Sequence, residues 1–257
     1  MAERRFEGKT VMVTGAGTGF GAEIAVRAAA EGARVVVHYR SSAAGAEETA
    51  RRIRDAGAEA VVVQCDITSW ADVKRMADAV FAEAGTLDAL VNNVGDMAAS
   101  QNSWRELTEE SIDHVLAVDI KGTMVMVHEF GQRMLERQRG AIVNIGSTVI
   151  VRGSPRAPQY AAAKYGVLGI TKSYARAFAP HVRVNTFAPG FMRTDAVVNR
   201  ADWKAGRERE LVAATPAGRI PAPEEVAAAA LFLASDDAHH MTGVYMTCDG
   251  GYTMLGA

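Results

Sequence analysis

"VTGAGTGFGAEIA", residues 13–25, joins a short apolar run to a segment with helical spacing. Gly15, Gly19 and Gly21 lie where the backbone must turn tightly and approach a ligand closely, in the spacing G-x-x-x-G-x-G. A helix that begins after such a turn offers free N–H groups and a positive dipole end to a pyrophosphate. An ordinary tight turn between a strand and a helix would have the same glycines, so the rest of the chain has to decide.

Apolar runs and helical segments alternate along the whole chain. The runs are rich in β-branched residues and nearly continuous, as in strands that are buried on both faces. They cover residues 9–15, 33–39, 58–65, 87–93, 140–146, 182–188 and 243–248. The helical segments lie at roughly 20–31, 43–56, 69–84, 109–138, 158–179 and 223–234. This order predicts an α/β fold in which a doubly wound parallel sheet is covered by helices on both faces.

Composition and charge narrow the function classes. The chain has 257 residues, 49% hydrophobic and 23% charged, without a Pro/Gly/Ser-rich linker, so we expect one domain over residues 1–257. A net charge of −2 without a basic run disfavours nucleic acid and anionic membranes as partners. We expect a cytoplasmic protein, because no apolar run is long enough for a membrane span or a signal peptide. Neither the two cysteines, Cys65 and Cys248, nor the histidines have the spacing of metal ligands, so no metal site is expected.

Three strand ends carry residues that suit a dinucleotide. Asp66 follows the third apolar run, where a carboxylate can accept from an adenine amino group or cap the next helix. "VNNVG" (91–95) ends the fourth run and suits a backbone that lies close to a ribose or adenine. The second run ends in "HYRSS" (38–42), where an acidic residue would bind the ribose hydroxyls. Arg40 and Ser41 favour a 2′-phosphate instead, so we predict NADP over NAD, unless Arg40 is only a solvated surface residue.

"QYAAAKYG" (159–166) sets Tyr160 and Lys164 four residues apart with only alanines between them. Residues with this spacing are neighbours on one face of a helix. A cation beside a phenol favours the phenolate, which makes the tyrosine a candidate acid/base. A buried tyrosine and a solvated lysine that share a face by chance would look the same.

Taken together, these motifs resemble the short-chain dehydrogenases/reductases of the single-domain type, and most closely their 3-oxoacyl-carrier-protein reductase group. The resemblance spans essentially the whole chain. It rests on "TGAGTGFG" (14–21), "NNVG" (92–95), Ser147 thirteen residues before Tyr160, "YAAAK" (160–164), "PGFMRT" (189–194) and "DGG" (249–251). It implies a Rossmann-type sheet of seven strands and hydride transfer between NAD(P)H and a carbonyl carbon.

The resemblance also implies roles for individual residues. Tyr160 would be the general acid in reduction, Ser147 would hydrogen-bond the same substrate oxygen, and Lys164 would hold the nicotinamide ribose. The residues expected to contact the cofactor are Gly15, Thr18, Gly19, Phe20, Gly21, Arg40, Ser41, Asp66, Ile67, Asn93, Val94, Gly95, Tyr160, Lys164, Pro189, Gly190, Met192 and Thr194.

One residue departs from the family pattern. "AVDIKG" (117–122) has Asp119 where the family usually has an asparagine that steadies a water connecting the lysine to solvent. An aspartate has nearly the same shape but carries a charge and, when ionised, cannot donate. Asp119 therefore substitutes in the proton relay, or shifts the pH optimum or slows turnover, or marks a chain whose catalysis has decayed. We favour the first interpretation and count Asp119 with the catalytic residues.

The long stretch at about 190–215 does not fit the alternation and is typical of a substrate lid or binding loop. The candidate substrate residues are Met97, Val149, Phe191 and Trp203. They suit a 3-oxoacyl thioester or a similar, mostly apolar ketone, reduced with NADPH. An NAD-dependent polyol, sugar or steroid alcohol dehydrogenase is the alternative within the enzyme class. A non-catalytic NADP-binding regulator or scaffold is the alternative outside it.

Apolar faces on the two long helical segments bear on assembly. They include Met124, Val125, Met126, Val127 and Phe130. In the family this helix pair builds a dimer interface, and the C-terminal "YTMLGA" often completes a tetramer. The sequence therefore predicts a homotetramer, unless these faces pack only inside the monomer.

Overall fold

In the computed structural model, which describes residues 4–95, 103–154 and 156–254, seven strands form one sheet. The strand order is β3-β2-β1-β4-β5-β6-β7, and every neighbouring pair is parallel. The strands are β1 (Thr10–Val13), β2 (Arg34–Tyr39), β3 (Ala60–Gln64), β4 (Ala89–Asn92), β5 (Gly140–Ile145), β6 (Val182–Pro189) and β7 (Tyr245–Cys248). The predicted doubly wound α/β fold with a seven-stranded parallel sheet is confirmed.

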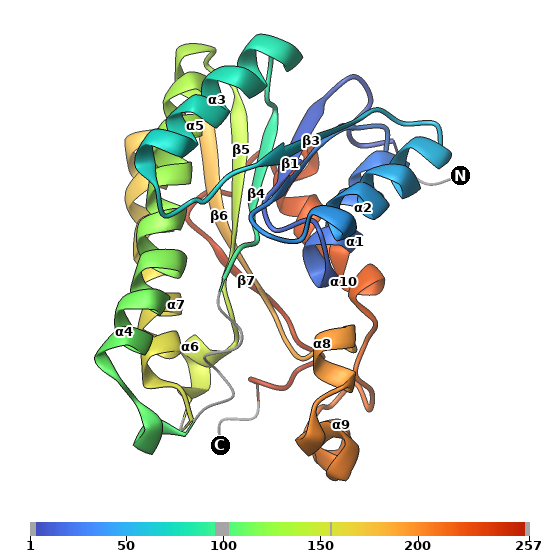
Figure 1. Cartoon of the computed structure of the whole chain (residues 1–257), viewed down its shortest axis with the longest axis vertical. Helices are drawn as coiled ribbons and strands as arrows, with labels where there is room; N and C mark the ends of the chain where they lie inside the picture. Colours follow the sequence, from blue (N-terminus) through green and yellow to red (C-terminus); the bar gives the residue numbers. More distant parts are fainter. Residues whose placement is uncertain (1–3, 96–102, 155, 255–257) are drawn as a thin grey trace.

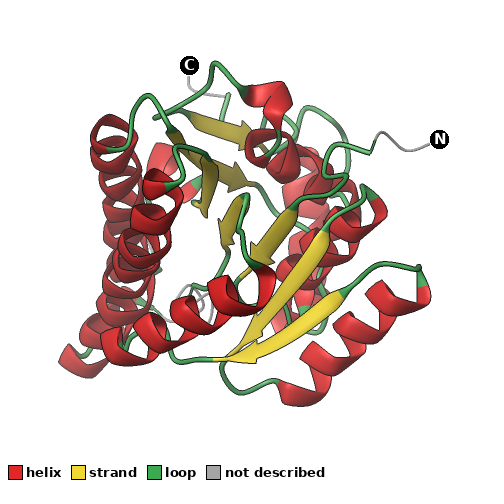
Figure 2. Ribbon diagram, turned by 90° about the horizontal axis from the view of Figure 1, so that it is seen from above, coloured by secondary structure: helices red, strands yellow, loops and turns green. Residues whose placement is uncertain are grey.

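Helices cover both faces of this sheet (Figures 1 and 2). The longer ones are α1 (Gly19–Ala30), α2 (Ala43–Asp55), α3 (Trp70–Ala84), α5 (Thr123–Glu136), α7 (Pro158–Ala177) and α10 (Pro223–Ala234). The shorter ones are η2 (Trp104–Glu106), α4 (Glu109–Val115), η3 (Leu116–Gly122), α6 (Val149–Arg152), α8 (Asp195–Val198), η4 (Trp203–Arg207), α9 (Glu208–Ala213) and η5 (Asp236–Ala238). Helices α1, α2 and α10 lie on one side, and α3, α4, α5 and α7 lie on the other (Figure 1).

Alternate residues of each central strand supply the two cores, because successive side chains in a strand point to opposite faces. Val11 and Val13 of β1 pack in the cluster with α1 and α10, whereas Met12 packs in the cluster with α3 and α5. In β2, Val35 and Val37 go with the first cluster and Val36 with the second. The continuous apolar runs in the sequence reflect this burial on both faces.

The segment predicted as one helix over 109–138 is interrupted. A π-helical turn, η3, separates α4 from α5 and contains Asp119, which is fully buried. Most of the apolar residues expected at a dimer interface, including Val125, Met126 and Phe130, are buried in the monomer core. Only Met124 of that set is exposed, so most of this apolar face packs inside the monomer.

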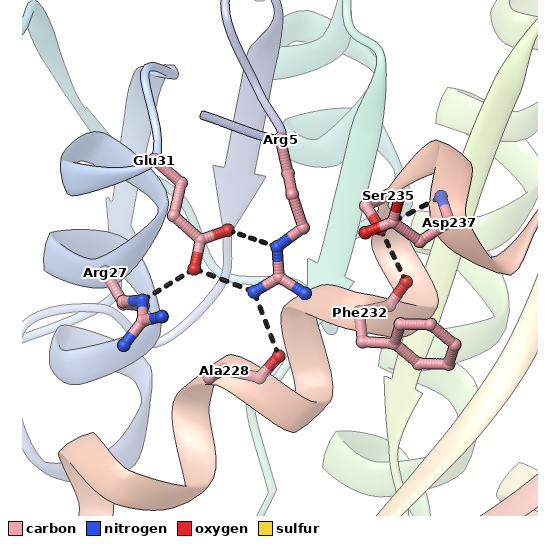
Figure 3. A network of polar contacts seen from close by, with 7 residues as sticks. All are labelled: Arg5, Arg27, Glu31, Ala228, Phe232, Ser235 and Asp237. Carbon is pink, nitrogen blue, oxygen red and sulfur yellow. Dashed lines mark hydrogen bonds and ion pairs between the residues drawn. The ribbon is translucent and has the colours of Figure 1, made fainter. Parts of the chain in front are cut away.

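A buried carboxylate ties the far end of α1 to neighbouring segments (Figure 3). Glu31 accepts two hydrogen bonds of 2.7 Å from the Arg5 guanidinium and one of 2.6 Å from Arg27. Arg5 also donates to the carbonyl oxygen of Ala228 in α10, at 3.3 Å. The Glu31 side chain is 1% exposed, and a charge buried in this way needs compensation, which both guanidinium groups supply. The network joins α1 to α10.

The stretch at about 190–215 is helical rather than irregular. Helices α8, η4 and α9 lie beyond the carboxyl ends of the strands (Figure 1). They have their own apolar cluster of Val197, Trp203 and Leu211, together with Ile220. In the part of the chain that the structure describes, no helix is both long and apolar enough to cross a membrane.

Candidate active site

The site lies where the strand order reverses. Strand β1 lies between β2 and β4 in the sheet. The α-helix that follows β1, α1, covers one face of the sheet, and the α-helix that follows β4, α4, covers the other (Figure 1). In such sheets ligands bind outside the carboxyl ends of the strands at this switch point. The glycine-rich turn follows β1, and the residues 92–95 end β4 at the same edge.

The glycine-rich turn has the shape of a phosphate cradle. Gly15 and Gly19 have φ values of +64° and +57°, which residues with a Cβ rarely adopt. A Cβ on Gly21 would lie 2.4 Å from the carbonyl oxygen of Gly15, whereas one on Gly19 would meet nothing within 4 Å. Thr18 caps α1 without a side-chain hydrogen bond, and the first turn of α1 has no acidic residue. The helix N-terminus is therefore suited to an anion such as a pyrophosphate.

Two further glycines, which sequence reasoning did not single out, let α2 pack on this turn. A Cβ on Gly17 would lie 2.3 Å from Oγ of Ser42, and one on Gly45 would lie 2.2 Å from the carbonyl oxygen of Gly17. The signal for Gly17 was present in "TGAGTGFG", but the closeness of Gly45 depends on the packing of α2. Ser42 therefore lies against the turn, while Ser41 and Arg40 are exposed beside it.

Asn93 and Thr14 join the end of β4 to the turn. The Asn93 amide nitrogen Nδ2 donates to the carbonyl oxygens of Thr14 and Gly15 at 3.0 and 3.3 Å. Oγ1 of Thr14 accepts from the backbone N–H groups of Asn93 and Val94 at 2.9 and 3.2 Å. These four hydrogen bonds hold the predicted cofactor residues at 93–95 against the glycine-rich turn.

Asp66 lies at the end of β3 in a turn of its own. Its carboxylate accepts from the backbone N–H of Thr68 at 2.9 Å and from the Thr68 hydroxyl at 2.7 Å. Burial would raise the pKa of Asp66, but the Thr68 hydrogen bonds and the nearby charge of Arg40 outweigh burial and lower it. Ser69, not Asp66, caps α3. Ile67 next to it is buried, and its side chain fills the space beside Gly122.

Tyr160 and Lys164 lie together on α7, both at least nine-tenths buried. The Lys164 ammonium Nζ is 2.8 Å from the Asp119 carboxylate and donates to the Ile145 carbonyl oxygen at 3.2 Å. It lies 5.5 Å from the centre of the Tyr160 ring. Gly95 leaves room for the pair, because a Cβ there would be 2.8 Å from Nζ and 2.9 Å from Oδ1 of Asp119.

The protonation of Lys164 follows from its partners. Burial by itself disfavours the ammonium, but the electrostatic interactions of Lys164 with Tyr160 and with the Asp119 carboxylate outweigh burial and raise the pKa of Lys164. Lys164 is therefore a buried cation at neutral pH. Asp119, which replaces the usual asparagine, is its direct ion-pair partner.

Ser147, at the end of β5, is held from two sides. Its Oγ accepts from the backbone N–H of Val149 at 3.2 Å, which leaves its own hydroxyl hydrogen available to donate. Its carbonyl oxygen accepts from the Tyr245 hydroxyl at 3.1 Å. Burial, with the charges of Asp249 and Tyr165, raises the pKa of Tyr245 to about 12, so it remains a donor. Sequence reasoning missed Tyr245, which looks like an ordinary residue of the last strand.

The remaining predicted residues lie at the starts of α1, α6 and α8 and at the end of β6. Phe20 stacks on Phe187 with ring centres 6.2 Å apart, and Met192 is buried in the same cluster. Pro189 ends β6, a Cβ on Gly190 would lie 2.8 Å from Cα of Asp249, and Thr194 caps α8. Val149 begins α6.

Two of the predicted substrate residues, Phe191 and Trp203, share the apolar cluster of α8, η4 and α9. Phe191 packs edge-on against Tyr252 with ring centres 5.6 Å apart, and the Arg152 guanidinium lies 4.5 Å over the same Tyr252 ring. Trp203 is 7% exposed and packs within the cluster of α8, η4 and α9. Met97 lies outside the described residues.

Comparisons with known proteins show which proteins this chain is similar to. A family model described as enoyl-(acyl carrier protein) reductase matches residues 15–253. D-threitol dehydrogenase of Mycolicibacterium smegmatis is 39% identical over 97% of this chain and 95% of the relative. The 3-oxoacyl-(acyl-carrier-protein) reductase FabG of Staphylococcus aureus is 34% identical over 96% of this chain and 98% of the relative.

A solved structure extends the match to three dimensions. The gluconate 5-dehydrogenase of Burkholderia cenocepacia, in complex with NADP and tartrate, superposes with a TM-score of 0.87 at 30% identity. The match covers 99% of this chain and 98% of that one. The chain therefore belongs to the short-chain dehydrogenase/reductase family and is an NAD(P)-dependent oxidoreductase.

Proposed function

We propose that the protein interconverts a ketone and its secondary alcohol with NADP(H), using Tyr160 as the general acid and base. The observation that carries this proposal is the buried Lys164 ammonium, which lies 5.5 Å from the Tyr160 ring and is paired with Asp119 at 2.8 Å. A cation fixed beside a phenol stabilises the phenolate that remains after the proton has been given to the substrate.

In reduction, Tyr160 donates its proton to the carbonyl oxygen, and the Ser147 hydroxyl donates a hydrogen bond to the same atom. Two donors aimed at one oxygen stabilise the charge that develops there. When bound, the nicotinamide supplies the hydride that reaches the carbonyl carbon. Oxidation of the alcohol runs the same proton transfer in reverse, with Tyr160 as the base.

Asp119 would serve this chemistry through Lys164. The ion pair keeps the ammonium charged and fixes its position, so that Lys164 can hold the nicotinamide ribose and face Tyr160. Asp119 is a positioning residue in this account, and its charge takes the place of the neutral amide that is usual in the family. A full set of Ser147, Tyr160 and Lys164 around it supports a working relay.

We assign the preference for NADP to Arg40 and Ser41. Both are exposed at the end of β2, beside the turn that would receive the pyrophosphate. The NADP in the structure of the related gluconate 5-dehydrogenase supports this choice. In Arg40→Ala the ratio of kcat/KM for NADPH to that for NADH should fall about tenfold or more, because a charge-assisted contact to the phosphate is lost. An unchanged ratio would assign the preference elsewhere, and Arg54→Ala on α2 is the matched control.

The substrate is proposed to be a 3-oxoacyl thioester or a similar, mostly apolar ketone. Val149 and Phe191, with the helical segment at about 190–215, would form the apolar walls. A polyol or sugar alcohol is the second candidate, because the D-threitol dehydrogenase is more identical to this chain than the 3-oxoacyl reductase is.

A substrate panel tests the proposal. Purified protein is assayed with NADPH and NADH on an acetoacetyl thioester, a cyclic ketone, a keto sugar and a steroid ketone, and with NADP and NAD on threitol. Turnover on one of these, reduced roughly 100-fold or more in Tyr160→Phe, is the expected result. Turnover that survives in Tyr160→Phe would remove Tyr160 from the role of acid and base.

We further propose a cytoplasmic homotetramer. The exposed apolar side chains Met124 and Tyr165 on α5 and α7 are consistent with a helix-pair interface between subunits. Light scattering on the purified protein tests the assembly, with four chains expected and a monomer contradicting the proposal.

A further inference from the structure

A buried histidine beneath the glycine-rich turn has no part in the chemistry described so far. His38 lies in β2 and is 1% exposed. Its ring nitrogen Nδ1 accepts from the backbone N–H of Gly15 at 3.2 Å, and Nε2 lies 3.1 Å from the carbonyl oxygen of Cys65. Its own carbonyl oxygen accepts from the N–H of Ala16 at 2.9 Å. One residue thus binds two successive amides of the turn and the end of β3.

These partners settle the tautomer. An amide N–H can only donate and a carbonyl oxygen can only accept, so Nδ1 carries no hydrogen and Nε2 carries one. Burial lowers the pKa of His38 to about 4, against the opposing effects of the Cys65 carbonyl and of Asp66. The ring is neutral at physiological pH, and both of its nitrogens are used.

The Gly15 amide has little freedom to move. A Cβ on Gly15 would lie 3.1 Å from a methyl carbon of Val94 and 3.2 Å from Nδ2 of Asn93. The carbonyl oxygen of Gly15 lies close under Gly21 in the first turn of α1. A displaced Gly15 would therefore move the start of α1, whose N–H groups would receive the pyrophosphate.

We propose that His38 is a positioning residue for the cofactor. Its imidazole ring holds the glycine-rich turn against the end of β3, in the shape that receives the diphosphate of the dinucleotide. The inference rests on the proposed use of NADP(H) by this site. Without the ring acceptor, the Gly15 N–H loses its partner, and the turn must move or admit water to satisfy it.

Three substitutions separate the two ring contacts. In His38→Asn the side-chain oxygen lies near the place of Nδ1 and can still accept from Gly15. In His38→Gln the longer side chain reaches the place of Nε2 and can still donate to Cys65, but it leaves Gly15 without an acceptor. His38→Leu loses both contacts. Val36→Ala, on the same strand but packed in the α3 and α5 core, is the control for lost stability alone.

The measurements are the dissociation constant for NADPH, by fluorescence titration, and the hydrogen-exchange rate of the Gly15 amide in the cofactor-free protein. We expect His38→Gln to weaken NADPH binding roughly tenfold and to speed exchange by a similar factor, since one buried hydrogen bond is lost. His38→Asn should stay within about threefold of the native protein on both, and Val36→Ala should bind as the native protein does. In the control Val36→Ala, kcat at saturating NADPH should also be unchanged.

Equal effects of His38→Asn and His38→Gln, or no effect of either, would overturn the inference, and so would a fall in kcat at an unchanged dissociation constant. If His38→Leu does not fold, the Asn and Gln pair still decides. Failure of the native protein to bind NADPH would instead contradict the proposed function, and the exchange rate of Gly15 in the cofactor-free protein would still report on the contact.

Discussion

His38 of β2 and Lys164 of α7 are both buried near the carboxyl ends of the strands, and they are held in opposite protonation states. His38 faces a backbone N–H and a backbone carbonyl, and burial lowers its pKa to about 4, so it is neutral. Lys164 faces the Asp119 carboxylate at 2.8 Å, and its pKa is raised, so it is a cation. Burial disfavours charge at both sites, and only Lys164, which is in direct ion-pair contact with a carboxylate, keeps its charge.

Removing the carboxylate is expected to have the largest effect. Asp119→Leu leaves the Lys164 ammonium buried without its counter-ion and should lower the free energy of unfolding by about 3–5 kcal/mol. The folded-state pKa of Lys164 lies above its ordinary value of 10.5, so this stabilisation is complete at neutral pH and is lost only as pH rises beyond that value. Asp119→Asn, which keeps the shape and an acceptor, should lose less. Denaturant unfolding at pH 7 measures both, and a fully stable Asp119→Leu would contradict the ion pair.

The histidine has the opposite pH dependence. Unfolded chains bind a proton on this histidine below pH 6.5, whereas the folded protein does so only near pH 4, so stability falls as pH drops through this window. Between pH 7 and pH 5 the advantage of the native protein over His38→Asn should shrink by about 2 kcal/mol. Denaturant unfolding of both proteins across this range measures the difference in unfolding free energy. The carboxyl groups that the two proteins share contribute equally to both and cancel. A constant difference would show that His38 is not buried in its neutral form.

A methyl group next to the ion pair should disturb only the lysine side of the comparison. In Gly95→Ala the new Cβ would lie within 3 Å of both Nζ of Lys164 and Oδ1 of Asp119, so the pair must shift. We expect a loss of about 1–3 kcal/mol in unfolding free energy together with reduced kcat, because the core there is already filled. Gly169→Ala in α7, whose Cβ meets nothing within 4 Å, is the control and should be neutral or stabilising. Unchanged kcat in Gly95→Ala would separate catalysis from the geometry of the pair.

The smallest expected effect concerns the hydroxyl that holds Ser147. Tyr245→Phe removes one hydrogen bond to the Ser147 carbonyl oxygen and should cost about 1 kcal/mol, seen as a several-fold lower kcat at unchanged KM for NADPH. Steady-state kinetics with the substrate found in the panel measure it. A raised KM for NADPH instead would place the action of Tyr245 on the cofactor.

The sequence predicted what depends on local pattern. The alternation of apolar runs and helical segments predicted the strands and the sheet class, and residue spacing singled out the glycine-rich turn, Tyr160 and Lys164. The resemblance added Ser147 and the role of each residue. His38 and Tyr245 escaped notice because each looks like an ordinary strand residue. Their contacts, with Gly15, Cys65 and Ser147, join residues 23, 27 and 98 positions apart, and these meet only when the sheet is assembled.

The departures from expectation have a similar cause. A single helix over 109–138 has the right periodicity, but the π-helical turn that carries Asp119 into the core depends on the contact with Lys164 and on the packing of α7. Apolar residues such as Phe130 gave no sign of which neighbour would cover them, and the sheet of the same monomer does so.

At neutral pH Lys164 is charged and His38 is neutral, although both are buried near the carboxyl ends of the strands. The most direct measurement is nitrogen NMR of protein labelled at histidine and lysine side chains, recorded from pH 8 to pH 5. We predict one histidine in the Nε2–H form that does not titrate in this range and disappears in His38→Asn. We also predict a slowly exchanging lysine ammonium signal that is lost in Asp119→Leu. A His38 that titrates near pH 6.5, or a Lys164 that is a neutral amine, would contradict the account.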